Sequence, residues 1–301
     1  MLNLRRLQLL VELRRLGTIA AVGQALHYSP SGVSQQLATL EDETGVTLLE
    51  RVGRRVRLTR AGEILCDNAV IMLEQAERTE AALAEVQTKA TGQVKIAAFQ
   101  TFNIAILPNL IRNLAEQQIE VIASQLEPEA ALPALLNHEF DVAIAEGYGD
   151  HQPATTRDLR TLAVMKDPLY LAIPKNMTGT VTEIADTAAM PWVMEPDDSL
   201  SRRWAVSRCR EAGFEPRVRY QTNDLLTHVA LIKSGHAVGF LPALIKACTA
   251  LDNVTLLTLD SPFRRVKVIT RAQSIHYPAV VTTVEEIRAL SQHHSGRDIS
   301  F

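Results

Sequence analysis

A segment of thirty residues, 61–90, constrains the fold of this chain more than any other feature. It contains no proline, its only glycine is Gly62, and small or apolar residues recur alternately every four and three positions. These residues are Leu65, Ala69, Met72, Ala76, Thr79, Leu83, Val86 and Ala90. Such spacing is a heptad pattern, which predicts one long helix whose seam faces a second helix. A single amphipathic helix packed on its own domain shows the same periodicity, so that interpretation stays open.

The predicted helix divides the chain into segments 1–60, 61–90 and 91–301. With 301 residues, 47% of them hydrophobic and 22% charged, the composition is that of a globular protein with more than one core. The net charge is only -3, but residues 1–62 carry +4 and residues 63–90 carry -4. This distribution indicates that only the N-terminal segment meets a polyanion.

The N-terminal segment predicts three helices with a tight turn between the second and the third. Regularly spaced leucines indicate an amphipathic helix over about 2–15, closed by Gly17. Thr18 is suited to cap a short helix, IAAVGQAL, and His27 and Tyr28 follow as the turn. This order favours a helix-turn-helix.

The third predicted helix begins with Ser29 as its cap and Pro30 in its first turn, and it ends at Gly45. One face is apolar and predicts contact with a core, with Val33, Leu37 and Leu40. The opposite face carries only small or uncharged residues, namely Ser31, Ser34, Gln35 and Ala38. A major groove about 12 Å wide admits a helix with short donors and acceptors on its face. A protein-binding helix or an accidentally polar face is the alternative.

The stretch LLERVGRRVRLT, which follows this helix, predicts two short strands about a Val52-Gly53 turn. Arginines cluster on it, at Arg51, Arg54, Arg55 and Arg57. Guanidinium groups on such a hairpin are suited to phosphate or minor-groove contact. The helix and the basic hairpin together therefore predict a winged DNA-binding module.

The sequence from Leu4 to Gly62, including GTIAAVGQALHYSPSGVSQQLATLEDETGVTLLERVGRRVRLTRAG, resembles the winged helix-turn-helix of LysR-type transcriptional regulators. The resemblance implies DNA contact by Ser29, Pro30, Ser31, Ser34, Gln35 and, on the wing, Arg51 and Arg54. Pro30 stands where many members have Gln, so it contributes geometry without a donor and leaves base preference nearby open. Leu49 replaces a common Phe, which implies a change in packing.

The same resemblance implies that helix 61–90 is a linker that pairs two subunits and separates two recognition helices, one for each half-site. We therefore expect a homodimer or a dimer of dimers, a homotetramer, on double-stranded DNA. The implied operator is an interrupted inverted repeat.

Residues 91–301 alternate between strand and helix patterns, which predicts a parallel α/β sheet with crossover helices. VKIAAF, IEVIASQL and FDVAIAEGY are strand-like, and LPNLIRNLAEQQ and ALPALLNHE are helical. A second set of strands and helices starts near residue 165. The LysR resemblance extends here more weakly, to a two-lobed periplasmic-binding-protein-like (type 2) effector domain. It implies one lobe from 92–164 with 267–301 and another from 165–266.

Ligands of such sheets bind at the carboxyl ends of strands, often against helix N-termini. This rule selects Gln100, Thr101, Glu146, Asp198, Ser199, Thr222, Asn223 and Phe240 as effector-binding candidates. Each of them is also suited to be a helix cap or a loop residue. Glu195, Asp197 and Asp198 are suited either to an amine on the ligand or to pairing with Arg202 and Arg203, and we favour the pairing.

No catalytic, metal-binding or cofactor-binding pattern occurs in the sequence, so we expect no enzyme, no metal site and no cofactor. Cys66, Cys209 and Cys248 are widely spaced, and we expect them to be reduced and buried, as in a cytoplasmic protein. Charged residues interrupt any signal-like core near the N-terminus, at Glu12, Arg14 and Arg15, and no apolar run is long enough to span a membrane.

The sequence thus predicts an effector-responsive, DNA-binding transcriptional regulator with a homo-oligomer, operator DNA and a small molecule of unknown identity as its partners. The alternative is a solute-binding protein or a binding-protein-fold enzyme with an N-terminal extension. Salt-sensitive binding to operator DNA distinguishes the two.

Overall fold

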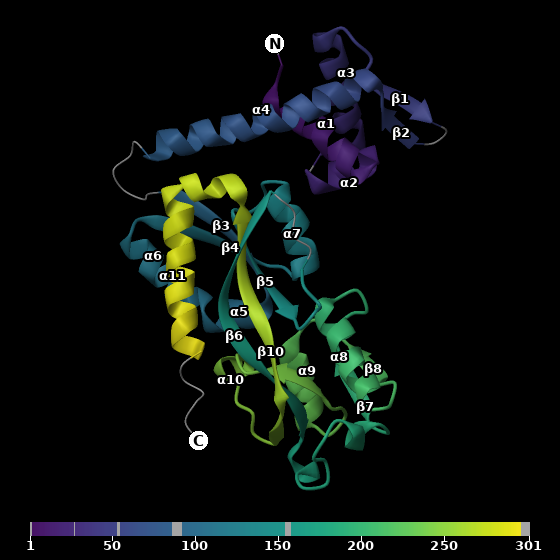
Figure 1. The fold of residues 1–301 in the computed structure, drawn as a ribbon, viewed down its shortest axis with the longest axis vertical. Coiled ribbons are helices and arrows are strands. Elements are labelled where there is room, and N and C mark those ends of the chain that lie inside the picture. The colour runs from purple at the N-terminus through teal and green to yellow at the C-terminus, as the bar shows by residue number, and fades with distance from the viewer. Residues whose placement is uncertain (1, 27, 53–54, 86–91, 154–157, 296–301) are drawn as a thin grey trace. The chain divides into compact units, whose positions relative to one another are not determined.

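A computed structural model describes residues 2–26, 28–52, 55–85, 92–153 and 158–295 (Figure 1). Residues 1–88 make up most of one compact part, and most of the remainder forms a second. No helix among the described residues is long and apolar enough to cross a membrane.

Three helices begin the first part, in the order that the sequence predicts. They are α1 (Leu4–Leu16), α2 (Ile19–Ala25) and α3 (Pro30–Thr44). The side chains of Thr18 and Ser29 accept hydrogen bonds from backbone N–H groups and cap α2 and α3. Gly17 and Gly45 end α1 and α3 in the left-handed conformation, which costs glycine little. The local signals in the sequence therefore set these helix ends correctly.

The turn between α2 and α3 requires glycine at position 23. A Cβ there would lie 2.7 Å from the carbonyl oxygen of Tyr28. The Tyr28 N–H in turn donates to the Gly23 carbonyl at 2.8 Å. The backbone after α2 thus folds back directly onto the helix, which fixes the direction in which α3 begins.

The predicted hairpin is present as β1 (Leu49–Val52) and β2 (Arg55–Leu58), which pair antiparallel. Glu41, near the end of α3, positions it: its Oε1 accepts from the N–H groups of Leu48 at 2.7 Å and Leu49 at 3.0 Å. The side chain of Leu49 is partly buried against the core of this part. Position 49 is therefore a packing position.

The long helix α4 (Arg60–Glu85) confirms the prediction through residue 85. Leu65 and Ala69 pack into the core of their own domain, and Ala69 is fully buried, so the expectation of a free seam at these two positions is wrong. The reason is that α1 lies against this part of α4. Ile64, Ile71 and Met72 are exposed instead. The side chain of Leu83 and residues Val86 and Ala90 lie outside the described structure.

The second part is built on a six-stranded sheet with the order β4-β3-β5-β10-β6-β9. Its strands are β3 (Gly92–Ala98), β4 (Ile119–Gln125), β5 (Val142–Tyr148), β6 (Leu159–Pro174), β9 (Gly239–Pro242) and β10 (Val254–Arg271). β3 pairs parallel with β4 and β5, but β10 is antiparallel to both β5 and β6, and β9 is antiparallel to β6. The sheet is therefore mixed, which corrects the expectation of a parallel one, because β6 and β10 run in opposite directions as a long ribbon.

Helices and a small sheet complete two groups of elements. Around β3–β5 lie α5 (Gln100–Ala105), α6 (Leu107–Glu116), α7 (Pro128–Leu136) and α11 (Pro278–Ser295). The second group contains the parallel pair β7 (Pro191–Met194) and β8 (Arg217–Gln221), with β9, α8 (Leu200–Glu211), α9 (Leu225–Lys233) and α10 (Ile245–Cys248). We call these groups the first lobe and the second lobe, and β6 and β10 run through both. Short 3-10 helices occupy Lys175–Met177, Ala185–Thr187 and Ala272–His276.

The two lobes have separate hydrophobic clusters. In the first lobe, α7 packs through Ala131 and Leu135 on Ala143 and Ala145 of β5. In the second lobe the largest cluster surrounds Trp192. The predicted lobe boundaries at 164/165 and 266/267 fall inside β6 and β10, where the pairing register shifts between Val266 and Lys267. A bulge of this kind bends a strand pair, so the ribbon is deformed where the chain passes between lobes.

Candidate nucleic-acid interface and ligand cavity

The uncharged face of α3 is exposed along its length. Ser31, Ser34, Gln35 and Ala38 are all exposed, whereas Val33, Leu37 and Leu40 on the other face are buried. Ser29 and Pro30 are exposed at the start of the helix, and the Ser29 Oγ accepts from the Gly32 N–H at 3.0 Å. The first turns of α3 therefore present exposed hydroxyl and amide groups.

The adjacent residues Gln35 and Gln36 lie in different environments on α3. The Oε1 of Gln36 accepts from Nε of Arg6 at 3.0 Å and ties α3 to α1. Gln35, one residue earlier, is exposed. Since neighbouring helical residues point about 100° apart, one glutamine is structural and the other is available to a ligand.

The wing carries the other predicted DNA contacts. Arg51 lies on β1, opposite Val56 of β2, but its side chain and the whole of Arg54 lie outside the described structure. Arg57 on β2 is exposed. The Glu41 contacts with Leu48 and Leu49 attach the start of the hairpin to α3. The hairpin that carries the arginine positions is thereby held next to this helix.

A cavity between the two lobes brings most of the predicted effector-binding residues together. Its lining includes Gln100, Thr101, Glu146, Ser199, Asn223 and Phe240. Asp198 and Thr222 do not line it. The side chain of Asp198 is exposed beyond the turn, and the Thr222 Oγ1 accepts from the Asp224 N–H at 3.1 Å within the turn before α9. For these two residues effector binding stays a prediction, because turn residues at a strand end point away from a cavity as readily as into it.

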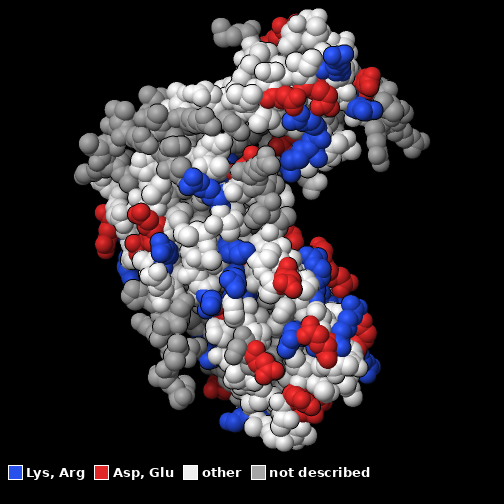
Figure 2. Space-filling model, in the orientation of Figure 1, with Lys and Arg blue, Asp and Glu red and all other residues white. Residues whose placement is uncertain are grey.

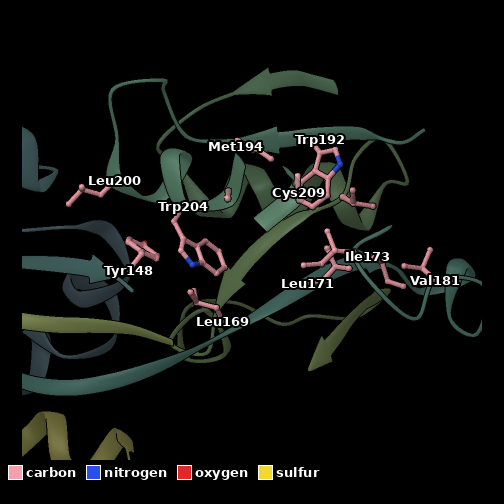
Figure 3. Close-up of a cluster of buried hydrophobic side chains, with 13 residues drawn as sticks. Tyr148, Leu169, Leu171, Ile173, Val181, Trp192, Met194, Leu200, Trp204 and Cys209 are labelled. Atoms are coloured by element: carbon pink, nitrogen blue, oxygen red, sulfur yellow. The ribbon is translucent and has the colours of Figure 1, made fainter. Parts of the chain in front are cut away.

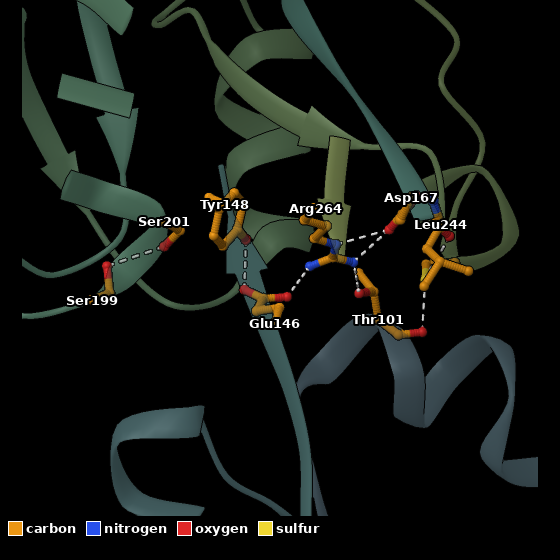
Figure 4. A network of polar contacts seen from close by, with 9 residues as sticks. Thr101, Glu146, Tyr148, Asp167, Ser199, Ser201, Leu244 and Arg264 are labelled. Atoms are coloured by element: carbon orange, nitrogen blue, oxygen red, sulfur yellow. Dashed lines mark hydrogen bonds and ion pairs between the residues drawn. The ribbon is translucent and has the colours of Figure 1, made fainter. Parts of the chain in front are cut away.

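Arg264 dominates the polar wall of the cavity, although the sequence analysis did not select it (Figure 4). Its Nη2 donates to Thr101 Oγ1 at 2.7 Å, its Nη1 contacts Glu146, and its Nε donates to Asp167 Oδ2 at 2.8 Å. Tyr148 extends the network by donating its hydroxyl to Glu146 Oε1 at 2.6 Å. The second carboxylate oxygen of Asp167 accepts from the Leu244 N–H at 3.0 Å. One guanidinium therefore joins β5, β6, β10 and α5.

Burial and pairing act against each other in this network. Desolvation raises the pKa of Glu146 and of Asp167, and the nearby Arg264 opposes that rise. For Arg264, burial works against the charged form, but the carboxylates of Glu146 and Asp167 outweigh it and raise its pKa. The guanidinium thus stays charged, and the carboxylates of Glu146 and Asp167 compensate its positive charge.

A strand-pattern signal could have revealed this network. Arg264 shares a strand face with Val266 and Val268, which are both buried. Asp167 likewise shares a face with Leu169 and Leu171. A charged residue in the buried register of a strand is an anomaly that indicates a buried ion pair.

Two side chains of the first lobe reach helix starts in the second lobe. The Gln100 amide donates to Asp224 Oδ1 at 2.7 Å and accepts from the Leu225 N–H at 2.8 Å, at the start of α9. Glu129 Oε1 accepts from the Leu200 N–H at 3.0 Å, at the start of α8. Gln100 therefore bridges the lobes as well as lining the cavity.

Three aromatic rings also line the cavity, those of Tyr148, Trp204 and Phe240. Figure 3 shows Tyr148 and Trp204 next to each other. The ring centroids of Tyr148 and Trp204 are 5.6 Å apart, and those of Trp204 and Phe240 are 4.9 Å apart. In Figure 3, Trp204 lies close to Tyr148 and Leu169, whereas Trp192 lies farther from them. The cavity lining thus contains both a polar network and aromatic rings.

Four glutamates also reach the cavity, at Glu127, Glu129, Glu146 and Glu195. Burial raises the pKa of Glu127 to about 8, and the charges of Glu146, Glu129 and Glu195 add to the rise. Asp197, by contrast, pairs with Arg202 at 3.1 Å, and the Asp198 carbonyl accepts from Arg203 at 2.9 Å. The Asp197 contact agrees with the pairing interpretation, whereas the Asp198 contact is through the backbone and does not involve its carboxylate.

The outer surface of the second lobe is balanced in charge. Figure 2 shows basic and acidic side chains interspersed over the region of α8 and β8, where Arg208 pairs with Glu211 and Arg210 with Glu215. The excess of carboxylates is therefore a property of the cavity and not of this outer face.

The three cysteines are free thiols, and burial raises the pKa of Cys66 and Cys248 to about 11 and that of Cys209 to about 12. Cys66 and Cys209 are buried as expected, whereas Cys248 is only partly buried. No group of three or more potential metal ligands occurs among the described residues.

Family models match nearly the whole chain. Residues 4–63 match the bacterial regulatory helix-turn-helix protein model of the lysR family, and residues 87–292 match the LysR substrate binding domain. The chain belongs to the LysR family. This LysR-family protein is therefore a DNA-binding transcriptional regulator with an effector-binding domain, as the resemblance of its N-terminal motif implied.

Named relatives agree with the family assignment. The chain is 28% identical over 244 residues to the nitrogen assimilation regulatory protein nac of Escherichia coli, covering 80% of this chain and 78% of the relative. It is 26% identical to the transcriptional dual regulator OxyR of E. coli over 301 residues, covering 97% of each chain.

Solved structures show the same fold. Full-length OxyR from Pseudomonas aeruginosa matches with a TM-score of 0.65 at 22% identity, over 96% of this chain and 95% of that one. Full-length CbnR in complex with its target DNA matches with a TM-score of 0.54 at 23% identity, over 96% and 100% of the two chains.

Proposed function

We propose that this LysR-family regulator reads operator DNA with the exposed face of α3 and responds to a small molecule held between its two effector lobes. The observation that carries the DNA part is the exposed, uncharged face with Ser31, Ser34 and Gln35, on a helix that Ser29 caps and Glu41 links to the wing. Short hydroxyl and amide groups reach base edges in a major groove. Arg51 and Arg54 of the wing add phosphate or minor-groove contacts.

The working division is 1–60 for DNA binding, 61–90 for dimerisation and 91–301 for effector binding, with lobes 92–164 plus 267–301 and 165–266. Ile64, Ile71 and Met72 support the dimer, because these apolar side chains are exposed on α4 in the single chain. A two-fold dimer places two α3 helices on two half-sites, which fits an inverted-repeat operator. Because the operator is genomic DNA, the protein works in the cytoplasm, and it acts by binding and not by catalysis.

The cavity is the proposed effector site, with Gln100, Thr101, Glu146, Ser199, Asn223 and Phe240 as lining residues. Bonds from Gln100 and Glu129 to the starts of α9 and α8 link the lobes across it. An effector that binds more tightly to one lobe arrangement shifts the population toward it and changes how the dimer presents α3.

A gel shift tests the DNA part with the full chain and a fragment from upstream of its own gene. The unmodified protein should bind, with an affinity that falls steeply as salt rises. Ser34→Glu places an acid on the reading face and should abolish the shift, whereas Ser234→Glu, on an exposed loop after α9, should leave it unchanged. Equal binding by both variants would show that α3 does not face DNA.

A further inference from the structure

The ligand cavity contains more acidic than basic groups. Arg264 is the one cationic side chain among its described lining residues, against the four glutamates at positions 127, 129, 146 and 195. Its guanidinium already contacts Glu146, Asp167 and Thr101. Because every side of Arg264 is engaged, it has no uncompensated positive charge to attract an anionic ligand.

Two of the helix N-termini at the cavity, those of α8 and α9, are also occupied. At the start of α8, the Leu200 N–H donates to Glu129 and the Arg202 N–H to the Ser199 Oγ. At the start of α9, the Leu225 N–H donates to Gln100. Free N–H groups at helix starts are what an anion binds, and here protein oxygens already accept from them. The carboxylate of Glu129 in particular stands where an anionic ligand of α8 would bind.

Glu127 and Glu195 differ from these engaged groups. Neither carboxylate forms a hydrogen bond or ion pair with any residue in the described part of the chain, although both line the cavity. Glu127 is largely removed from solvent and is surrounded by Glu129, Glu146 and Glu195, with Arg264 as the opposing charge. A carboxyl group in this setting gains from a positive charge that the protein itself does not provide.

The aromatic rings in the lining are suited to the apolar part of a ligand. Trp204 packs its ring against both Tyr148 and Phe240, so three rings line one side of the cavity. Aromatic side chains offer a large apolar contact surface. A ligand with an apolar body next to a cationic group therefore fits both the aromatic rings and the carboxylates of the lining.

We propose that the cavity binds a small organic cation, with an ammonium or guanidinium group at Glu127 and Glu195 and an apolar body against Trp204 and Phe240. This inference rests on the proposed function, because it names the chemical class of the effector. At the starts of α8 and α9, oxygen atoms of the protein already accept from N–H groups that an anionic ligand would otherwise bind.

The experiment compares three probes of similar shape on the full-length protein at neutral pH. Benzylamine is positively charged, benzoate is negatively charged and benzyl alcohol is neutral. Thermal unfolding is recorded at equal millimolar concentrations, and dissociation constants are measured by calorimetry. The variants are Glu127→Gln, Glu195→Gln and the double substitution, with Glu116→Gln, exposed at the end of α6, as the matched control. DNA binding is measured on the same preparations.

Benzylamine should raise the Tm of the unmodified protein and of Glu116→Gln, and the other two probes should not. In the double variant the Kd for benzylamine should rise at least about tenfold, because the charge partners are gone. These substitutions keep side-chain size and remove repulsion, so the free variants should fold, as circular dichroism will show. Unchanged benzylamine binding in the double variant would place the amine elsewhere and overturn the inference.

Two other outcomes also overturn it, in distinguishable ways. Stabilisation by benzoate alone refutes the cationic class but leaves the cavity as the effector site. No stabilisation by any probe refutes both the class and the cavity assignment. The DNA-binding part of the proposed function is judged separately, from the gel shifts of the same samples.

Discussion

Nε and Nη2 of Arg264 both lie 2.8 Å from Oδ2 of Asp167, and neither side chain is exposed by more than 2%. The two residues come from adjacent antiparallel strands, β10 and β6, where they stand directly opposite each other. The contact thus fixes the ribbon that runs through both lobes. Arg264 is the only cationic side chain in the described cavity lining, and this contact pairs it with a carboxylate of the protein.

Replacing Arg264 with methionine should therefore destabilise the effector domain strongly. The change leaves the buried carboxylates of Glu146 and Asp167 without a positive counter-charge, which costs about 3–5 kcal/mol. Both tryptophans, Trp192 and Trp204, lie in the second lobe, so their fluorescence in urea reports unfolding of this domain. Arg265→Met is the control, because the neighbouring guanidinium is exposed and lies 5.1 Å from the centroid of the Phe263 ring. Its expected cost is below about 1 kcal/mol, and equal losses would contradict a special role for Arg264.

The paired glutamines of α3 provide a test of base reading. Gln35→Ala should reduce discrimination between operator variants by about 1–3 kcal/mol if the amide makes a bidentate base contact. Gln36→Ala should leave base preference intact and lower stability instead, because it removes the acceptor of Arg6. Affinities on a panel of single-base operator variants measure both effects. Unaltered discrimination by Gln35→Ala would remove that residue from the readout.

The stability of the effector domain should depend on pH through Glu127. Its pKa is about 8 in the folded chain, against an ordinary value of 4.5, so the folded state holds a proton that the unfolded state has lost. The contribution is fully present below pH 4.5 and is lost as the pH rises through about 8. Glu127→Gln should remove this decline and be the more stable protein at pH 8, by on the order of 2 kcal/mol.

Urea titrations of the unmodified protein and Glu127→Gln at pH 5, 7 and about 8.5 measure this difference. Glu116→Gln serves again as the exposed control and should follow the unmodified protein at every pH. Parallel stability curves for Glu127→Gln and the unmodified protein would show that Glu127 titrates normally.

The turn of the DNA-binding module should reject any side chain at position 23. In an open helix, Gly→Ala stabilises by up to about 1 kcal/mol. In α2 the added Cβ would meet the backbone oxygen of Tyr28 at 2.7 Å, and a backbone atom does not yield as a flexible side chain does. We therefore expect a net loss of about 1–3 kcal/mol. Hydrogen exchange over residues 18–44 should accelerate in Gly23→Ala and stay unchanged in the exposed neighbour variant Gln24→Ala.

Much of the DNA-binding module could be predicted because its signals are local. The Ser29 cap, the Gly45 stop and the spacing of Val33, Leu37 and Leu40 act within a few residues of one another, and the structure confirms them. The sequence pattern also predicted α4 through residue 85, but not which of its faces meets its own core. That choice depends on α1, which packs against Leu65 and Ala69 from a distant part of the sequence.

For the cavity, the rule of strand ends selected Thr101, Glu146 and Ser199 among its lining residues, but it also selected Asp198 and Thr222, which lie outside it. By itself, the sequence determined the order of elements, the family and the uncharged face of α3. Only the tertiary structure decided that Arg264 is neutralised by Glu146 and Asp167 and that Glu129 occupies the start of α8. The physical reason is that charge compensation depends on distances between residues more than 70 positions apart, which local patterns do not encode.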